Sequence, residues 1–257
     1  METQSGTIDW VKRASEAVAK GLGHLLWPGQ CINCRQRPVE GDELCGDCWQ
    51  RLISVCGAEF CRRCGRDASP YAISGGVCAR CGDEEIHFDK IGRAGVYAEA
   101  LRETILGFKH GQTELDKVLG GLIDSALQAS SFSQEVEIFV PVPLHWYKRL
   151  IRGYNQSLVL AKKLKHPTAK ISTDLVRIRN TEEQPTMPTI AAKARNVEGA
   201  FAVRLGHPFE GRRVCLIDDI KTTGATLNEC AKTLKEAGAS KVFALVLGVA
   251  GQDKRNF

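Results

Sequence analysis

Residues 213–227, Arg-Val-Cys-Leu-Ile-Asp-Asp-Ile-Lys-Thr-Thr-Gly-Ala-Thr-Leu, decide the fold and hold the main candidate site. The apolar run at 214–217 suits a strand that is buried on both faces. Two adjacent carboxylates follow it, and then a turn rich in hydroxyl groups. The turn leads into an amphipathic helix, whose apolar residues recur at helical spacing up to a stop at Gly238. Strand, acidic pair, Thr/Gly turn and helix in this order predict a site for a phosphorylated sugar.

The turn and the helix start that follows it predict the phosphate end of this site. A helix N-terminus leaves several backbone N–H groups unpaired and carries a partial positive charge, so it attracts anions. Gly224 allows close approach of the backbone, and the hydroxyls of Thr222, Thr223 and Thr226 add donors to phosphate oxygens.

The two carboxylates predict a different contact, because they cannot bind phosphate themselves. Asp218 and Asp219 suit the vicinal hydroxyls of a ribose, or a hydrated Mg²⁺ ion. A phosphate at one end and a diol at the other predict a ribose 5-phosphate. The alternative is an ordinary strand–helix connection, since Asp and Thr are common before helices.

Residues 216–226, Leu-Ile-Asp-Asp-Ile-Lys-Thr-Thr-Gly-Ala-Thr, resemble the motif with which type I phosphoribosyltransferases bind phosphoribosyl pyrophosphate (PRPP). From the first cysteines to its end, the chain resembles the competence protein F (ComF) family. The resemblance implies an α/β fold, with a type I phosphoribosyltransferase-like parallel sheet and flanking helices behind a small double zinc-ribbon domain. It implies that PRPP contacts Ile217, Asp218, Asp219, Ile220, Lys221, Thr222, Thr223, Gly224, Ala225 and Thr226.

Composition is that of an ordinary globular protein. The 257 residues are 43% hydrophobic and 25% charged, and they suffice for one large or two modest domains. The formal net charge is +5, and two zinc ions each bound by four thiolates would bring it close to neutral. Total charge therefore does not indicate nucleic-acid binding. No segment reaches transmembrane length and the N-terminus lacks a secretory pattern, so we expect a cytoplasmic protein.

The chain is expected to divide into four parts. These are an N-terminal amphipathic helix, a double zinc ribbon, a phosphoribosyltransferase-like domain and a tail, at 1–29, 30–86, 87–251 and 252–257. The apolar stripe of the first helix suits docking on the body of the protein. Its basic residues and Trp27 also permit peripheral contact with a membrane or a partner.

Eight of the eleven cysteines form four Cys-x-x-Cys pairs. Each pair presents two thiolates on one turn, and two pairs complete a tetrahedral zinc site. An odd cysteine total without a secretory signal disfavours disulfides, and all-thiolate ligation indicates a structural metal. Cys56 has no partner at this spacing. The predicted Zn²⁺ ligands are Cys31, Cys34, Cys45, Cys48, Cys61, Cys64, Cys78 and Cys81.

The spacing leaves two pairings open, sequential or crossed, and the resemblance to a double zinc ribbon favours the sequential one. Basic residues among the ligands would allow contact with nucleic-acid phosphates, and neighbouring acidic residues weaken that case. The basic residues are Arg35, Arg37, Arg62, Arg63, Arg66 and Arg80, and the acidic ones are Asp42, Glu43, Asp47, Asp83, Glu84 and Glu85.

The rest of the chain alternates expected strands with expected helices, as in an open α/β sheet. The doubly wound core is expected to begin at Val136, and the ligand site to lie at the carboxyl ends of its strands. We expect strands at 89–97, 138–143, 171–178 and 241–249, and helices at 98–108, 114–129 and from 155 onward.

Three further segments are candidates for contact with an anionic ligand. Lys109, in a segment similar to the one ahead of the ComF core, suits either an anion across the cleft or a solvated helix end. Residues 141–156 closely match the ComF signature, and the resemblance assigns this loop to pyrophosphate. Its cationic side chains suit that ligand, although a basic surface loop is the alternative. The candidates are His145, Lys148, Arg149, Arg152 and Asn155.

Residues 179–198 are long, polar and without apolar periodicity, which predicts a functional or disordered loop. In type I phosphoribosyltransferases a flexible loop closes here over the reacting centre, and closure would exclude water. The resemblance assigns Arg195 to it. Many family members carry a basic residue ahead of Gln184-Pro185, whereas this chain has Glu182-Glu183.

Two functions follow as hypotheses. The first is a phosphoribosyltransferase in which Asp218, Asp219 and Arg195 act on PRPP with Mg²⁺, and pyrophosphate leaves toward an unknown acceptor. The second is a non-catalytic adaptor or PRPP sensor in DNA uptake. The resemblance implies a role in natural competence, with single-stranded DNA and competence-machinery proteins as partners.

Overall fold

The computed structural model describes residues 29–39, 44–68, 73–79, 81, 84–147, 150, 153–180 and 189–251. The helix expected at 8–27 and the tail at 252–257 lie outside these residues. The chain divides into two compact units, 1–50 and 51–257. No helix in the described ranges combines the length and the apolar character that crossing a membrane requires.

The first unit contains a short hairpin and the start of a helix. Strand β1 (Gly29–Gln30) pairs antiparallel with β2 (Pro38–Val39). Helix α2 (Gly46–Ile53) begins directly after Cys45 and runs across the boundary between the units. Buried cysteines form the small core of this unit, so a metal rather than an apolar cluster is expected to organise it.

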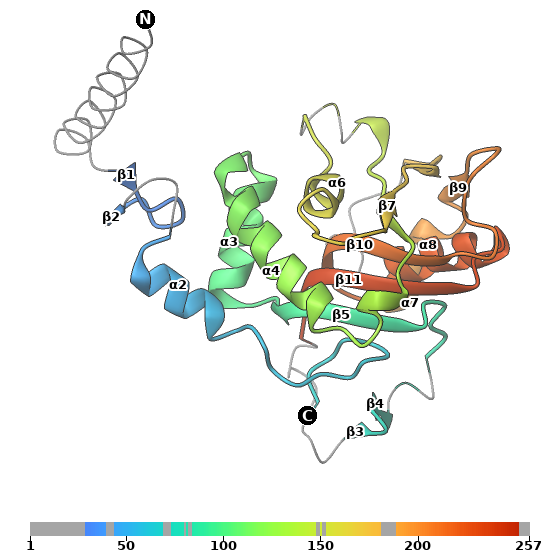
Figure 1. Ribbon diagram of the computed structural model, residues 1–257, viewed down its shortest axis with the longest axis horizontal. Coiled ribbons are helices and arrows are strands. Elements are labelled where there is room, and N and C mark those ends of the chain that lie inside the picture. Colours follow the sequence, from blue (N-terminus) through green and yellow to red (C-terminus); the bar gives the residue numbers. More distant parts are fainter. Residues whose placement is uncertain are drawn as a thin grey trace, which may run out of the picture. The chain divides into compact units, whose positions relative to one another are not determined.

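A five-stranded, fully parallel sheet forms the centre of the second unit (Figure 1). The strands of this sheet are apolar, which suits its central position, because a parallel sheet needs cover on both faces. In spatial order the strands are β5 (Lys90–Val96), β11 (Lys241–Val249), β10 (Arg213–Lys221), β6 (Ile138–Pro141) and β7 (Lys170–Ile171).

The sheet begins earlier in the sequence than expected. The prediction of a core starting at Val136 is wrong, because β5 pairs in register with β11, for example Ala244 with Ile91. The last strand, β11, therefore lies inside the sheet, and β5 forms its edge. Periodicity identified both strands but carries no information about which strands become neighbours.

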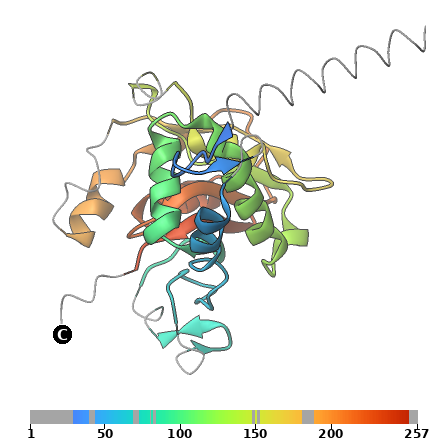
Figure 2. The same ribbon diagram turned by 90° about the vertical axis from the view of Figure 1, so that its left-hand side faces the viewer.

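Helices pack against both faces of the sheet (Figures 1 and 2). Alternate residues of β10 point to opposite faces, and Leu216 joins the apolar cluster formed with α8. On the other face, Phe243 stacks on Phe132, which follows α4 in the chain. The helices are α3 (Glu99–Lys109), α4 (Asp116–Gln128), α6 (Gln156–Ala161), α7 (Ile190–Val197) and α8 (Ala225–Glu236), with 3₁₀ turns η3 (Thr113–Leu115) and η4 (Ser133–Glu135).

The single strand expected at 171–178 is two strands. β7 joins the main sheet, whereas β8 (Leu175–Arg177) pairs antiparallel with β9 (Phe201–Val203) in a separate sheet. Ser172 and Asp174 explain the break. The Ser172 hydroxyl donates to the Asp174 carboxylate at 2.7 Å and accepts from the Asp174 N–H at 3.2 Å, and such local bonds compete with strand pairing.

The segment 179–198 is also more ordered than expected, since its second half forms α7. Thr189 caps this helix by accepting a hydrogen bond from the N–H of Ala192 at 3.0 Å. The expected strands at 89–97, 138–143 and 241–249 and the helices at 98–108 and 114–129 are confirmed to within a few residues. The predicted fold class, a parallel α/β sheet with flanking helices, is confirmed as well.

Candidate functional site

The acidic pair lies on the sheet rather than after it. Strand β10 continues through Asp218 and Asp219 to Lys221, so neighbouring carboxylates start from opposite faces of one strand end. The backbone N–H of Asp219 donates to the Asp218 carboxylate at 2.9 Å. Asp219 is 8% exposed and Asp218 is half-buried, so the hydrogen-bond and ion-pair partners of the two carboxylates affect their stability.

Each carboxylate has a partner from a different element. The Ser157 hydroxyl, in the first turn of α6, donates to Asp218 at 3.0 Å. The ammonium of Lys109, the last residue of α3, pairs with Asp219 at 2.8 Å. Lys109 is therefore not a solvated helix end, and three segments that are distant in the sequence meet at the acidic pair.

The two carboxylates of the pair have different electrostatic surroundings. Burial raises the pKa of Asp218 from 3.8 to about 7, and the charge of Asp219 acts in the same direction. The Lys109 ammonium and the hydrogen bonds from Asp219 and Ser157 oppose this rise only in part. Asp218 therefore changes its charge near neutral pH.

Asn155 organises the helix that supplies Ser157. Its side-chain oxygen accepts from the Ser157 N–H at 3.0 Å, and its amide donates to the Val142 carbonyl at 3.1 Å. The hydroxyl of Tyr154 donates to the carbonyl of Phe108, which ties the same loop to the end of α3. Asn155, assigned from the sequence to pyrophosphate, thus has its side chain engaged in positioning α6.

The rest of the predicted pyrophosphate loop is described only in part. His145 is buried, and its Nδ1 accepts from the N–H of Tyr147 at 3.4 Å. Trp146 and Tyr147 are 67% and 50% exposed. Lys148, Arg149 and Arg152 lie outside the described residues.

The turn after β10 has the backbone that a phosphate site requires. Gly224 is the N-cap of α8 and has a φ of +89°, a left-handed conformation that favours glycine. A Cβ atom there would lie 2.8 Å from the Lys221 side chain, which shows how closely the two pack. The Thr223 hydroxyl accepts from the Ala225 N–H at 3.4 Å. Thr222 is exposed and Thr226 half-buried.

The two isoleucines of the motif differ from its polar residues, because their side chains are wholly or partly buried. Ile217 is fully buried in the sheet, and its carbonyl accepts from the N–H of Val142 at 2.9 Å. Ile220 is half-buried and pairs with Gly248 of β11. Both residues therefore help to position the end of the strand.

A cavity of about 490 Å³ opens beside the turn. Its walls come from the turn, from α7 and from the segment that follows the second cysteine cluster, and the acidic pair is not among its lining residues. The cavity therefore adjoins the turn and not the carboxylates. It is lined by Arg66, Glu84, Glu85, Ile86, Phe88, Lys193, Ala194, Lys221, Thr222, Thr223, Gly224, Ala225, Asn228, Ala250 and Gly251.

Three cations lie on or near this cavity, and the sequence assigned a role to two of them, Arg195 and Arg66. Lys193 lines it, whereas Arg195, predicted to act at the reacting centre, is exposed at the last turn of α7. Arg66, considered a nucleic-acid contact, pairs with Glu84 at 2.5 Å and also lines the cavity. No sequence pattern links a zinc-ribbon arginine to a turn more than 150 residues away, because the contact depends on tertiary packing.

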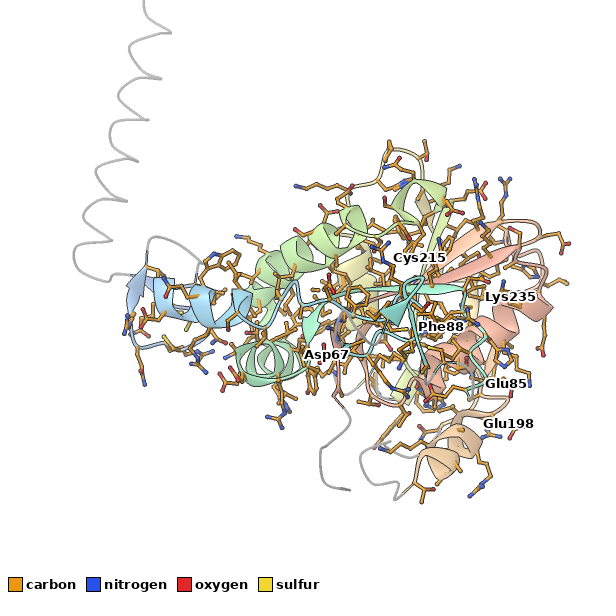
Figure 3. The ribbon with its side chains drawn as sticks, turned by 90° about the horizontal axis from the view of Figure 1, so that it is seen from below. Asp67, Glu85, Phe88, Glu198, Cys215 and Lys235 are labelled. Atoms are coloured by element: carbon orange, nitrogen blue, oxygen red, sulfur yellow. The ribbon has the colours of Figure 1, made fainter. Side chains whose placement is uncertain are left out.

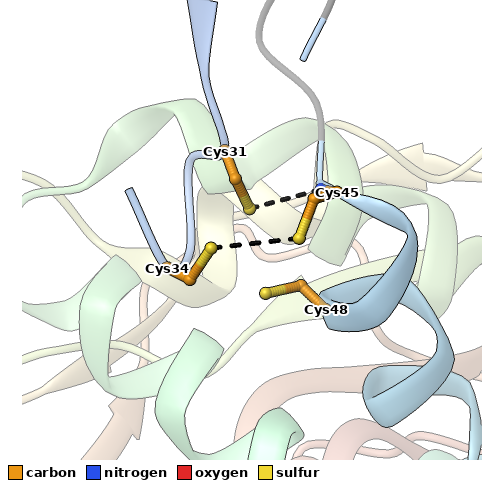
Figure 4. Close-up of side chains that lie close together, drawn as sticks. All are labelled: Cys31, Cys34, Cys45 and Cys48. Atoms are coloured by element: carbon orange, nitrogen blue, oxygen red, sulfur yellow. Dashed lines mark hydrogen bonds between the residues drawn. The ribbon is translucent and has the colours of Figure 1, made fainter. Parts of the chain in front are cut away.

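The cysteines form two clusters of four, Cys31/Cys34/Cys45/Cys48 and Cys61/Cys64/Cys78/Cys81, which confirms sequential pairing. Figure 4 shows the first cluster, with the Cys45 N–H donating to the Cys31 sulfur at 3.3 Å. Sulfur–sulfur distances are 3.9 Å in the first cluster and 3.5–3.7 Å in the second. Four sulfurs at Zn–S bonds of about 2.3 Å in a tetrahedron lie about 3.8 Å apart, so both clusters fit zinc.

One thiol in each cluster is poised to ionise. Burial opposes ionisation of Cys31, but backbone hydrogen bonds from Cys45, Cys34 and Asn33 outweigh it and lower the pKa to about 6. Corresponding bonds lower the pKa of Cys61 to about 7. A metal needs thiolates, so these bonds favour the ligating form.

Several ribbon arginines are engaged within the protein. Arg37 pairs with Asp47 at 2.5 Å, and Arg63 donates to backbone carbonyls of the segment 86–89. Arg35 and Arg62 are exposed, and Arg80 lies outside the described residues. Of the arginines considered for contact with nucleic-acid phosphates, Arg37 and Arg63 are thus already bonded within the protein.

The chain is similar to known proteins both in its cysteine-rich part and over most of its length. The double zinc ribbon domain family matches residues 22–88. Competence protein F of Haemophilus influenzae is 30% identical over 223 residues, which cover 83% of this chain and 93% of that protein. Competence protein ComFC of Bacillus subtilis is 27% identical over 207 residues, covering 77% of this chain and 80% of that protein.

A second group of relatives has a name that refers to DNA. DNA utilization protein YhgH of Escherichia coli strain K12 is 26% identical over 230 residues, covering 85% of this chain and 96% of that protein. Among solved structures, a hypoxanthine phosphoribosyltransferase from Staphylococcus aureus is 14% identical, with a TM-score of 0.33 over 54% of this chain and 75% of that one.

Proposed function

The chain belongs to the competence protein F family, and on that premise we propose that it binds PRPP at residues 217–226 and transfers or senses its ribose in competence-related handling of DNA. Relatives named for competence and for DNA utilization support the biological context. The acidic pair and the Thr/Gly turn at 222–226, called the phosphate turn below, support PRPP as the ligand.

The observation that carries the proposal is the meeting of three segments at the end of β10. Lys109 from α3 and Ser157 from α6 reach the two carboxylates, and the glycine turn follows on the same strand. A sugar held between them would have its hydroxyls at the carboxylates and its phosphate at the α8 N-terminus. An ordinary strand–helix connection would need neither Lys109 nor Ser157 at its carboxylates.

The charges of the free site suggest how a ligand is received. Lys109 neutralises Asp219 while no ribose is bound, and ribose hydroxyls would replace it there. The released ammonium would then face the anionic ligand. Mg²⁺, when bound, would neutralise part of the pyrophosphate charge, and carboxylate oxygens are the ligands it prefers. Sequence assigns Lys148, Arg149 and Arg152 to the departing pyrophosphate.

The test is the double variant Asp218→Asn/Asp219→Asn, in which each amide keeps the shape of the carboxylate. Isothermal titration with PRPP and Mg²⁺ should show binding to the wild type and a loss of at least about 100-fold in the variant, since two charged contacts disappear. Zinc content and circular dichroism should be unchanged. Glu236→Gln, an exposed change at the far end of α8, is the control.

Equal PRPP affinity in the wild type and the double variant would contradict the assignment of the site. Pyrophosphate release, measured in the same samples with nucleobases, amines and DNA fragments as acceptors, separates the two forms of the proposal. A transferase releases pyrophosphate, whereas a sensor binds PRPP and leaves it intact.

A further inference from the structure

The second cysteine cluster is bonded to the body of its unit around the turn that carries Arg66. The guanidinium of Arg93, on β5, donates to the Gly65 carbonyl at 2.8 Å. Arg63 donates to carbonyls within 86–89, at 2.7 Å for the first of them. A Cβ atom on Gly65 would lie 3.1 Å from Val249 of β11. These contacts fix the position of the turn against the sheet.

The segment that leads from this cluster to β5 is bonded to α8. Asn228, in the second turn of α8, donates from its amide to the Glu85 carbonyl at 2.9 Å and accepts from the His87 N–H at 2.6 Å. Figure 3 labels Glu85 and Phe88 on this segment. The cavity beside the phosphate turn is thereby closed on one side by the ribbon and its connection.

Two cations of this cavity lack a full set of partners. Lys221 is 4% exposed, and within the described residues its ammonium makes no hydrogen bond or ion pair. It lies against the turn, since a Cβ atom on Gly224 would be 3.3 Å from it. Arg66 uses one nitrogen for Glu84, while its Nη1 is buried without a hydrogen-bond partner. Buried donors without acceptors are destabilising, so an anion in the cavity would stabilise both groups.

We propose that Arg66 and Lys221, together with the N-terminus of α8, bind the 5-phosphate of PRPP, so that the second zinc ribbon forms a wall of the binding site. The inference rests on the proposed function and adds to it a residue from outside the phosphoribosyltransferase-like segment. Arginine suits this role because its planar group can keep Glu84 on one nitrogen and offer another to a phosphate oxygen.

The experiment is titration of the full zinc-loaded chain, with PRPP and Mg²⁺ in one arm and inorganic phosphate in the other. Arg66→Gln should weaken both affinities by about 10-fold or more, since a hydrogen bond to a charged group is lost. Glu84→Gln should strengthen both severalfold, because the amide keeps an acceptor for Arg66 and removes a negative charge from the cavity. Arg62→Gln, an exposed arginine on the same ribbon, should change neither.

The affinity changes expected for Arg66→Gln and Glu84→Gln are opposite, and this difference distinguishes a binding role of Arg66 from a purely structural ion pair. If Arg66 served only to hold Glu84, both variants would lower thermal stability and leave affinity unchanged, and that result would overturn the inference. A wild type that binds phosphate but not PRPP would contradict the proposed function, and the phosphate arm would still decide the role of Arg66. A wild type that binds neither would overturn both.

Discussion

At the scale of single residues, the acidic pair shows that adjacent identical side chains can have different tasks. Lys109 pairs with Asp219, whereas Asp218 accepts hydrogen bonds from the hydroxyl of Ser157 and from the backbone N–H of Asp219. A sequence with two consecutive Asp residues cannot distinguish them. The difference arises from which element each face of β10 meets.

The raised pKa of Asp218 predicts opposite effects of pH on stability and on binding. Its pKa is about 7 in the folded protein against an ordinary 3.8, so this group binds more protons in the folded state between these values. Its contribution to the free energy of unfolding is full below pH 4 and is lost as the pH rises through 7. Ligand binding through the carboxylate should instead strengthen over the same rise.

Asp218→Asn tests both effects. At pH 8 the variant should unfold at higher urea than the wild type, by on the order of 1 kcal/mol, because no charge is confined there. Its PRPP affinity should be low and should vary less with pH between 5.5 and 8.5 than that of the wild type. A variant that is less stable than the wild type at pH 8 would show that the ionised carboxylate is better accommodated than its pKa indicates.

At the scale of elements, the sequence predicted the regular segments well and the interruptions poorly. Strand β11 and helices α3 and α4 follow from periodicity alone, because each buries one continuous apolar surface. The break between β7 and β8 depends on two short polar side chains that bond each other. Helix α7 follows a polar stretch, and only its Thr189 cap indicates where it starts.

The start of α6 gives a prediction at this scale. Asn155→Ala removes the cap and should lower the free energy of unfolding by about 1 kcal/mol. It should also weaken PRPP binding, since Ser157 then loses its fixed orientation toward Asp218. Asn155→Ser, which can still cap, should recover most of the stability. Urea unfolding and titration measure the two effects.

If Asn155 instead contacted the ligand directly, the serine variant would regain stability without regaining affinity. Recovery of both properties together identifies a positioning role. That distinction was beyond the sequence, where Asn155 stands in a motif assigned to pyrophosphate. Its two hydrogen bonds to the backbone give it another task.

At the scale of the whole molecule, the metal clusters could be predicted almost completely. Thiolate spacing fixed the ligands, and the pairing needed only the family resemblance. The division into units could not be predicted from spacing, since the structure places the two clusters in different units. The second cluster is joined to β5 by Arg93, which the sequence did not single out, and to the segment before β5 by Arg63, which the sequence offered as a nucleic-acid contact.

Removal of one metal at a time should therefore have unequal consequences. Cys61→Ser/Cys64→Ser should lower the melting temperature of the second unit and weaken PRPP binding, because Arg63, Arg66 and the segment to β5 lose their anchor. Cys31→Ser/Cys34→Ser should leave PRPP affinity close to wild type. Elemental analysis should show one zinc per chain in each variant. Equal losses of affinity would contradict this dependence.

The pairing of β5 with β11 has a consequence for the synthesis of the chain. Lys90 finds its partner Phe243 only after more than half of the protein has been added. Until then, during translation, the apolar strand β5 has no neighbouring strand, so its open edge can pair with a non-native strand. The bonds from the cysteine turn to β5 are local and can form early. Zinc uptake during translation would thus hold β5 in place until the last strand arrives.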